Sequence, residues 1–195
     1  YVPVQPFFTG FAEPVDVLTG FDELIYVVDA GTDEIVQLDR SGRELGRLRI
    51  PGVKAVAQDL RLDLLALGTV DTVVGGETFT LDAIYRIRQT ETTNGGVQLG
   101  FQFAEIVNTV IHPFYFKPSF TGGNDQSGDD EVRFVDLDVL ANNHYYVTRT
   151  GPIQDATRFG GPDDAVLEFS DEDEWVQNVG VSTDKGIERD YFDAP

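Results

Sequence analysis

Short runs of alternating apolar and polar residues, separated by turns rich in Asp, Gly and Ser, recur along the chain. They are clearest in residues 24–50, where Leu24 to Val28 is apolar and β-branched, Glu34 to Leu38 alternates, and Arg43 to Ile50 follows a tight turn. A period of two is typical of a strand with one packed face and one face in water. The pattern therefore predicts three strands here, with Gly42 free to adopt the positive φ that a tight hairpin turn needs.

The same rhythm extends on both sides of this stretch and divides the chain into units. The first unit also holds a strand at Val15 to Leu18. The second is predicted to hold strands at 53–58, 62–68, 80–88 and 97–103, a loop at 69–79, a polar turn at 90–96, and either a strand extension or a helical turn at 104–111. The third is predicted to hold strands at 132–140, 144–148, 164–169 and 174–179, a turn with asparagines tolerant of the αL region at 141–143, and a loop at 149–163. Such a meander cannot bury both of its faces alone, so neighbouring copies have to cover it.

Internal similarity supports the division into units. Tyr26 to Gly31 matches Tyr146 to Gly151, and Leu65 to Thr69 takes the corresponding place in the middle unit. Phe11 to Pro14, which precedes the first strand, recurs as Phe192 to Pro195. Repeats of this length indicate a fold that stacks one supersecondary unit on the next.

The first unit contains three characteristic segments, Glu13 to Val17, Ile25 to Gly31 and Ile35 to Gly42. In these segments it resembles an NHL-type repeat. The resemblance is weaker in the third unit and weakest in the middle one, whose turns depart from the pattern. It implies an all-β fold, a β-propeller of four-stranded antiparallel blades, with about three blades and the stub of another in this chain. The alternative is a β-sandwich with a similar number of strands.

The implied propeller divides the chain into an N-terminal arm, three blades, a long loop and the start of a further blade. Their ranges are 1–13 for the arm, 14–50, 51–111 and 132–180 for the blades, 112–131 for the loop and 181–195 for the further blade. Open blade edges invite unwanted strand pairing. The remaining blades are therefore expected on residues outside this sequence or on another chain.

Composition narrows the classes of function. The 195 residues suffice for one domain with a core, and 34 acidic against 14 basic residues give a formal net charge of −20. This charge argues against nucleic acid and against an anionic membrane surface as partners, since both require basic clusters. There is no Cys, and no apolar run is long enough to span a membrane. The chain lacks Met even at its start, so a processed or partial chain is expected, with any signal peptide or lipid anchor outside the numbering.

The candidate binding residues lie in the long loops, which in a propeller gather on one face. The first half of the long connection is aromatic, with partner-binding candidates His112, Phe114, Tyr115, Phe116 and Phe120. These rings either anchor a partner or fold back over the core. Arg149 and Arg158 flank the loop at 149–163, where they either grip a carboxylate or pair with local acids.

The second half of the same connection is Gly-rich and acidic. Oxygen ligands of the kind that calcium prefers come from Asn124, Asp125, Asp129 and Asp130, although the spacing is not that of an EF-hand. A calcium site and a solvated loop both stay open, and no other cofactor is implied. His144 opens a predicted strand and is interpreted as structural. The sequence has no Gly-x-Ser-x-Gly elbow, phosphate-binding loop or His-Glu-x-x-His motif.

Two functions fit these observations. The first is a non-catalytic extracytoplasmic propeller, secreted or lipid-anchored in a bacterial envelope, that binds a protein partner or an envelope polymer as an accessory subunit of a larger assembly. The repeat, the missing catalytic motifs and the aromatic loop favour it, together with a fold-level likeness to propeller lipoproteins. The alternative is a propeller hydrolase or lyase with a divalent cation in the central channel.

Overall fold

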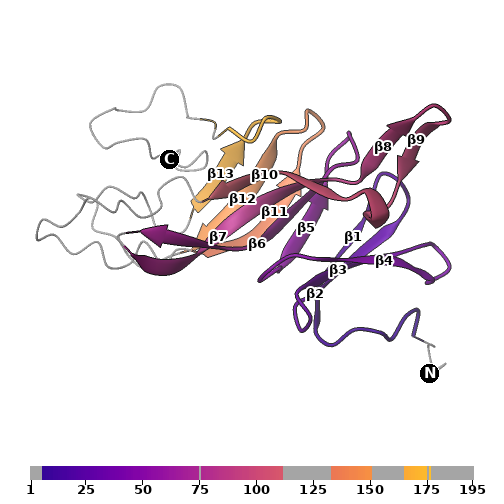
Figure 1. Cartoon of the computed structure of the whole chain (residues 1–195), viewed down its shortest axis with the longest axis horizontal. Helices are drawn as coiled ribbons and strands as arrows, with labels where there is room; N and C mark the ends of the chain where they lie inside the picture. Colours follow the sequence, from indigo (N-terminus) through magenta and orange to yellow (C-terminus); the bar gives the residue numbers. More distant parts are fainter. Residues whose placement is uncertain (1–5, 75, 112–132, 151–164, 175, 177–195) are drawn as a thin grey trace, which may run out of the picture.

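The computed structural model describes residues 6–74, 76–111, 133–150, 165–174 and 176, which are almost entirely β-structure (Figure 1). The first sheet is an antiparallel meander of β1 (Pro14–Thr19), β2 (Ile25–Asp29), β3 (Glu34–Leu38) and β4 (Glu44–Arg49), in that order. All four strands lie where the alternation predicts them. Within the described ranges the one helical element is the 3₁₀ turn η1 (Phe101–Phe103), and no helix there is long and apolar enough to cross a membrane.

The second sheet has the order β10-β7-β6-β5. Its strands are β5 (Ala55–Gln58), β6 (Leu64–Val74), β7 (Glu77–Arg88) and β10 (Glu105–Ile111). The loop predicted at 69–79 is wrong: this stretch belongs to one long β6–β7 hairpin, paired from Leu64–Ile87 out to Val74–Glu77. Its Thr and Val residues are strand formers, and Gly76 takes the positive φ, 92°, at the turn.

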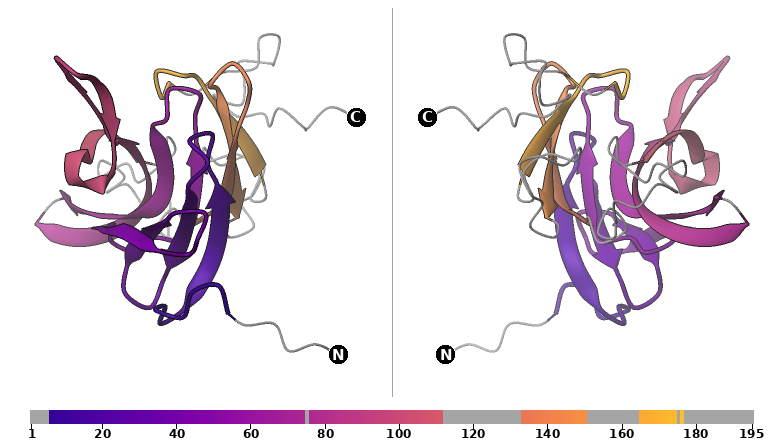
Figure 2. Two further views of the ribbon diagram at one scale, coloured as in Figure 1. Left: turned by 90° about the vertical axis from the view of Figure 1, so that its right-hand side faces the viewer. Right: turned by 90° about the vertical axis from the view of Figure 1, so that its left-hand side faces the viewer.

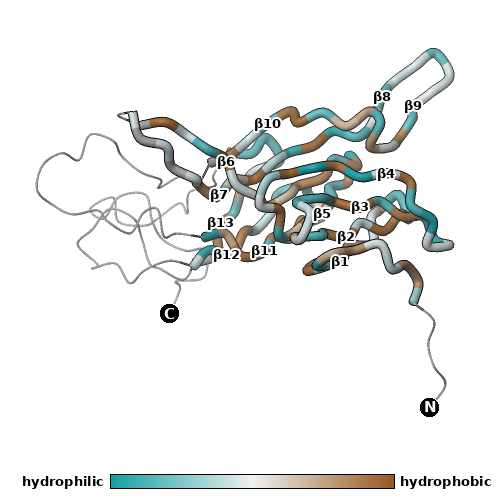
Figure 3. Tube along the Cα trace, turned by 60° about the horizontal axis from the view of Figure 1, so that its bottom comes forward, coloured by the Kyte–Doolittle hydropathy of each residue, from teal (hydrophilic) through white to brown (hydrophobic). Residues whose placement is uncertain are grey.

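An inserted hairpin explains two further errors in the second unit. β8 (Thr90–Thr93) and β9 (Gly96–Leu99) pair only with each other, so the predicted polar turn at 90–96 is largely a strand of threonines. The fourth strand of the sheet is β10 rather than residues 97–103, which decides the ambiguous segment 104–111 in favour of a strand. The insert projects from one end of the molecule in Figure 1 and is mostly hydrophilic in Figure 3.

The third sheet contains β11 (Arg133–Val139), β12 (Tyr145–Thr150) and β13 (Ala165–Phe169), in chain order. All three strands are predicted by the alternation. The fourth strand predicted at 174–179 falls mostly outside the described residues, but the Val176 N–H donates to the Glu168 carbonyl at 2.8 Å. The long loop at 112–131 and the further blade at 181–195 lie outside the described residues as well.

One turn geometry recurs at the same end of the sheets. In each case the fourth residue of the turn has a positive φ and its N–H donates to the carbonyl of the first, as in Gly42 to Asp39 (2.9 Å) and Leu62 to Asp59 (3.0 Å). The other members are Glu23, Asn143 and Asp173, with φ between 64° and 66°. This is a type I turn followed by an αL residue, a common connection in short hairpins. The sequence predicts the positive φ at Gly42 and an αL-tolerant residue at Asn143, but not the αL residues Glu23, Leu62 and Asp173.

The three sheets stack face to face (Figure 2). Apolar side chains fill both gaps between them. Between the first and second sheets lie Tyr26, Val28, Ile35, Val56, Leu64, Ala66 and Tyr85. Between the second and third lie Leu65, Leu67, Ile84, Phe134, Tyr145, Val147 and Phe169. Burying each large apolar side chain contributes roughly 1.5–3 kcal/mol.

The inner strands fix how the sheets are arranged. β5 contacts β1 on one side and β11 on the other. Two backbone N–H groups bridge the gaps near these strands: Val56 donates to Asp16 Oδ2 at 2.9 Å, and Phe134 donates to Asp82 Oδ2 at 2.5 Å. A two-layer sandwich would cover only one face of the middle sheet. The sandwich alternative is therefore wrong, because the middle sheet is covered on both faces.

Candidate functional site

Most of the predicted site residues lie outside the described part of the chain. These are the aromatic candidates His112, Phe114, Tyr115, Phe116 and Phe120, the calcium candidates Asn124, Asp125, Asp129 and Asp130, and Arg158. Arg149 is described, and it lies within strand β12 opposite Phe134 with 4% of its surface exposed. Its proposed role at a loop mouth stays a prediction. Within the described ranges no group of three or more potential metal ligands comes together.

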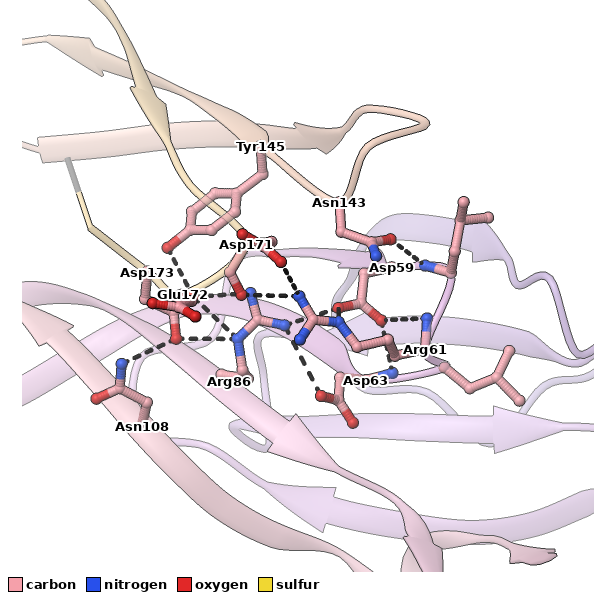
Figure 4. Close-up of polar contacts among 12 residues, drawn as sticks. Asp59, Arg61, Asp63, Arg86, Asn108, Asn143, Tyr145, Asp171, Glu172 and Asp173 are labelled. Carbon is pink, nitrogen blue, oxygen red and sulfur yellow. Dashed lines mark hydrogen bonds and ion pairs between the residues drawn. The ribbon is translucent and has the colours of Figure 1, made fainter. Parts of the chain in front are cut away.

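The largest group of charged side chains in the described residues surrounds Arg86, between the second and third sheets (Figure 4). We call it the Arg86 cluster. It comprises Arg86 on β7, Asn108 on β10, Tyr145 on β12, Asp59, Arg61 and Asp63 in the β5–β6 turn, and Asp171 and Asp173 in the turn after β13. Elements from both sheets thus meet at the end of the stack where the tight turns lie.

Arg86 and Asp173 form the link across the gap. Arg86 Nε donates to both oxygens of Asp173 at 2.9 Å, and Nη2 donates to Oδ1 at 2.7 Å. Asn108 Nδ2 (2.8 Å) and the Tyr145 hydroxyl (3.1 Å) donate to the same carboxylate. A forked guanidinium contact of this kind fixes orientation as well as charge. The positive φ of Asp173 brings its carboxylate to this position at the end of the turn.

Asp59 is the second anchor and is fully buried. Its Oδ2 accepts from Arg86 Nη1 at 2.7 Å, while its Oδ1 accepts the backbone N–H groups of Arg61 (2.8 Å) and Asp63 (3.0 Å). One carboxylate therefore both closes its own turn and neutralises Arg86. Two outer contacts add to the link between sheets: Arg61 Nη2 donates to Asp171 Oδ2 at 2.8 Å, and the Leu60 N–H donates to Asn143 Oδ1 at 2.8 Å.

The protonation states follow from this geometry. Burial alone would lower the pKa of Arg86, but the hydrogen bonds and charges of Asp173 and Asp59 outweigh it and raise that pKa. Burial, followed by the negative charge of Asp173, raises the pKa of Tyr145 well above its ordinary value. Arg86 is therefore charged and Tyr145 neutral at any pH the fold meets. Neither group is suited to proton transfer at neutral pH.

Asp63 differs from the other acids of the cluster. It is mostly buried, and its contact with Arg86, at 3.8 Å between Nη1 and Oδ2, is longer than that of Asp59. Burial and the nearby charge of Asp59 raise its pKa above the ordinary 3.8, although Arg86, Arg88 and Arg61 partly oppose this. The ionised form of Asp63 thus opposes folding.

Asp63→Asn is expected to stabilise the protein at neutral pH. A carboxyl with a raised folded pKa weakens folding as the pH rises from its unfolded pKa through its folded pKa. The gain in Tm should therefore be present at pH 7 and absent at pH 3, where Asp63 is protonated in both states. Thermal melts of the variant and wild type at both pH values test this; an equal or lower Tm for the variant at pH 7 would show that the Arg86 contact dominates.

A second, smaller polar cluster takes the corresponding place between the first and second sheets. The Tyr26 hydroxyl donates to Asp22 Oδ2 at 2.6 Å and accepts from Gln89 Nε2 at 2.8 Å and Gln37 Nε2 at 3.1 Å. Gln58 Nε2 donates to Asp22 at 2.8 Å from the neighbouring sheet. Both gaps thus end in a polar cluster at the tight-turn end. Their side chains bond to one another, which identifies the clusters primarily as links between sheets.

Sequence reasoning missed the Arg86 cluster for a definable reason. Alternation in 80–88 places Leu81, Ala83, Tyr85 and Ile87 on one side, and so assigns Arg86 to the side expected to face water. The middle sheet of a stack has no such side. Ile84 on the same side as Arg86 was the available signal, since an apolar residue beside an Arg on a middle strand indicates a covered face.

A second feature is a shallow, mostly polar hollow beside the β8–β9 insert. Its volume is about 680 Å³, and it is lined by Arg88, Thr90, Glu91, Thr92, Gln102, Phe103, Ala104 and Glu105. Two of these residues, Arg88 and Glu105, are cross-strand neighbours whose charged groups approach to 3.9 Å, and both are exposed. Exposed ion pairs of this kind interact only weakly. None of the residues that line the hollow is a buried polar residue directed into it.

Comparisons with known proteins address the fold. No protein-family model matches the sequence, and the comparison with curated proteins finds no match. Among solved structures, the chain is similar to a Thermus thermophilus protein assigned as an oxidoreductase (glucose dehydrogenase), with 16% identity and a TM-score of 0.52 over 87% of this chain and 48% of that one. Streptogramin B lyase (10% identity, TM-score 0.34, 83% and 56% covered) and virginiamycin B lyase from Staphylococcus aureus (7%, 0.30, 79% and 54%) match less well.

The chain spans about half the length of each of these proteins. At such low identity the first match informs on fold alone, and the two lyases have TM-scores too low to add to it. Three features of the structure agree with that match. The first two sheets are four-stranded and antiparallel, the inner strands of neighbouring sheets are in contact, and the middle sheet is covered on both faces. The chain has the fold of a β-propeller built from antiparallel blades.

Proposed function

We propose that this chain is a non-catalytic, extracytoplasmic propeller module that binds a protein partner or an envelope polymer as an accessory subunit of a larger envelope assembly. In this proposal its blades are of the NHL type, and the face opposite the tight turns makes the contact. The lyase or hydrolase alternative has no described residue arrangement in its favour.

The observation that supports the proposal most is the outer half of the β6–β7 hairpin. β5 pairs with β6 only as far as Leu67, and β10 pairs with β7 only as far as Ala83. Beyond Val70 and Leu81 the two strands therefore pair only with each other among the described residues, and they extend away from the blade (Figure 1). Val73 near the tip is 69% exposed.

This extension emerges at the end of the sheets opposite the Arg86 cluster. The charges at the tight-turn end pair with one another, whereas the hairpin presents an apolar side chain and two strand edges that no other described strand pairs with. Exposed strand edges readily accept a strand from another chain. The long links between units are expected on the same face, so the hairpin and the aromatic candidates would act together.

Shortening the β6–β7 hairpin is expected to abolish partner binding while leaving the fold intact. Replacing residues 71–80 with Asn-Gly joins the paired positions Val70 and Leu81 through a two-residue turn. The matched control replaces residues 91–98 with Asn-Gly, which shortens the β8–β9 insert between the paired Thr90 and Leu99. Both variants should keep the wild-type circular dichroism spectrum.

The readout is photo-crosslinking in cells of the source organism, with a photoreactive residue at the turn and mass spectrometry of the adducts. One specific adduct is expected from the wild-type hairpin and from the control variant, and none from the shortened β6–β7 variant. Equal adducts from both shortened variants would contradict the proposed contact face. A tightly held divalent ion together with turnover in a hydrolase screen would contradict the non-catalytic assignment.

A further inference from the structure

One face of the first sheet points away from the second sheet. Its positions are equivalent to positions that are buried in the other two sheets. The tight turn of the first sheet at Gly20 corresponds to that of the second at Asp59 and that of the third at Leu140. By this correspondence Val17 on β1 matches Val56 on β5 and Leu137 on β11. Val56 is 4% exposed and Leu137 7%, because the preceding sheet covers each of them, whereas Val17 is 67% exposed. Pro14, exposed, likewise matches the buried Val53 and Phe134.

The rest of this face is already covered, and by an unusual segment. Val27, Val36 and Leu38 are buried beneath Phe8 and Phe11 of the N-terminal arm. The same correspondence places Phe11 at the position of Ile50, the fully buried residue that follows the outer strand β4. The arm therefore runs where the outer strand of a preceding blade would run.

Backbone contacts support this assignment of the arm. Ala30 N–H donates to the Glu13 carbonyl at 2.9 Å, much as Thr69 N–H donates to the Pro51 carbonyl at 2.7 Å where the chain passes from the first sheet to the second. Asp29 holds the arm further, since its buried carboxylate accepts the N–H groups of Ala12 (2.9 Å) and Glu13 (2.6 Å). The arm is thus docked on the first sheet in the way that one blade connects to the next.

We propose that three strands of a further propeller blade, carried by the same polypeptide, seat between the arm and the inner part of the first sheet. The arm would supply the fourth, outer strand of that blade. The face that the incoming strands present has to be apolar, with small side chains opposite Val17, as Ala55 and Ala57 present to Leu137 and its neighbours. Residues 6–13 and the face around Val17 then form the seam at which the propeller closes.

Single-cysteine labelling of the complete natural gene product tests this: these 195 residues contain no cysteine, and any cysteine elsewhere in the gene product is first replaced by serine. Three variants are compared: Val17→Cys at the seam, Val56→Cys at the equivalent buried position, and Val73→Cys on the exposed hairpin. The proposal predicts that Val17→Cys reacts with a maleimide as slowly as Val56→Cys, at least about tenfold slower than Val73→Cys, because the native state protects it. Equal Tm values show that the variants fold alike.

Each other outcome overturns the proposal. Reaction of Val17→Cys at the rate of Val73→Cys would show that the face is open to solvent. Protection of Val17→Cys that disappears on dilution would show that a second copy, not the same polypeptide, covers it. If the Tm of Val56→Cys is lower than that of the wild type, Val53→Cys serves as a second buried reference at the same interface.

Discussion

Arg86→Ala is expected to lower the free energy of unfolding by about 3–5 kcal/mol, the usual cost of removing one partner from a buried ion pair. The loss leaves Asp59 and Asp173 ionised, buried and without the guanidinium that holds them. It also removes the main polar link between the second and third sheets. Urea denaturation followed by circular dichroism measures the effect.

The control lies two residues further along the same strand. Arg88 pairs with Glu105 at 3.9 Å, and both side chains are more than half exposed, so Arg88→Ala should cost less than about 1 kcal/mol. Combining Arg86→Met with Asp59→Asn, Asp63→Asn and Asp173→Asn should recover much of the loss, because the buried acids that Arg86 contacts are then neutral. A loss for Arg86→Ala no larger than that for Arg88→Ala would show that the cluster does not link the sheets.

Leu65→Ala is expected to cost about 2–5 kcal/mol, the range for a fully buried leucine that leaves a cavity. Leu65 lies on β6 in the middle sheet, is fully buried and packs into the gap toward the third sheet. Val73→Ala on the same strand is the control. Because Val73 lies on the free part of the hairpin, its replacement should change stability by no more than about 0.5 kcal/mol.

The comparison of these two variants separates the blade from its extension. If β6 were buried along its whole length, both substitutions would destabilise the protein strongly. If the sheets did not stack, Leu65→Ala would cost as little as Val73→Ala. Only a large loss for Leu65→Ala beside a small one for Val73→Ala agrees with a strand that is packed at one end and exposed at the other.

The sequence predicts the first sheet fully because its strands alternate and its turns carry Asp and Gly. The middle sheet is predicted poorly for two physical reasons. Its threonine-rich hairpins at 69–80 and 90–99 look polar enough for loops, although Thr is a good strand residue. Its strands are also covered on both faces, so a charged residue such as Arg86 can face inward, where alternation assigns it to water.

The candidate site was less predictable than the fold. The repeat match pairs Tyr26 with Tyr146, yet Tyr145 is the tyrosine that contacts the Arg86 cluster, because the side chains of neighbouring residues in a strand point to opposite faces. Asp59 and Asp173 come from turns of different sheets, 114 positions apart in the printed numbering. Only the stacking of the sheets brings them to one arginine, and no local pattern carries that information.

The most direct test of the stacked-blade arrangement is a methyl NOE experiment on the middle sheet. The structure predicts NOEs from Leu65 and Leu67 to methyl groups of the third sheet in their core cluster, and from Leu64 and Ala66 to methyl groups of the first sheet in theirs. The third-sheet residues are Leu137, Val147 and Leu167, and the first-sheet residues are Val28 and Ile35. Observation of both sets would establish that this sheet lies between two others. NOEs from only one of its faces would contradict the propeller and support a two-layered fold.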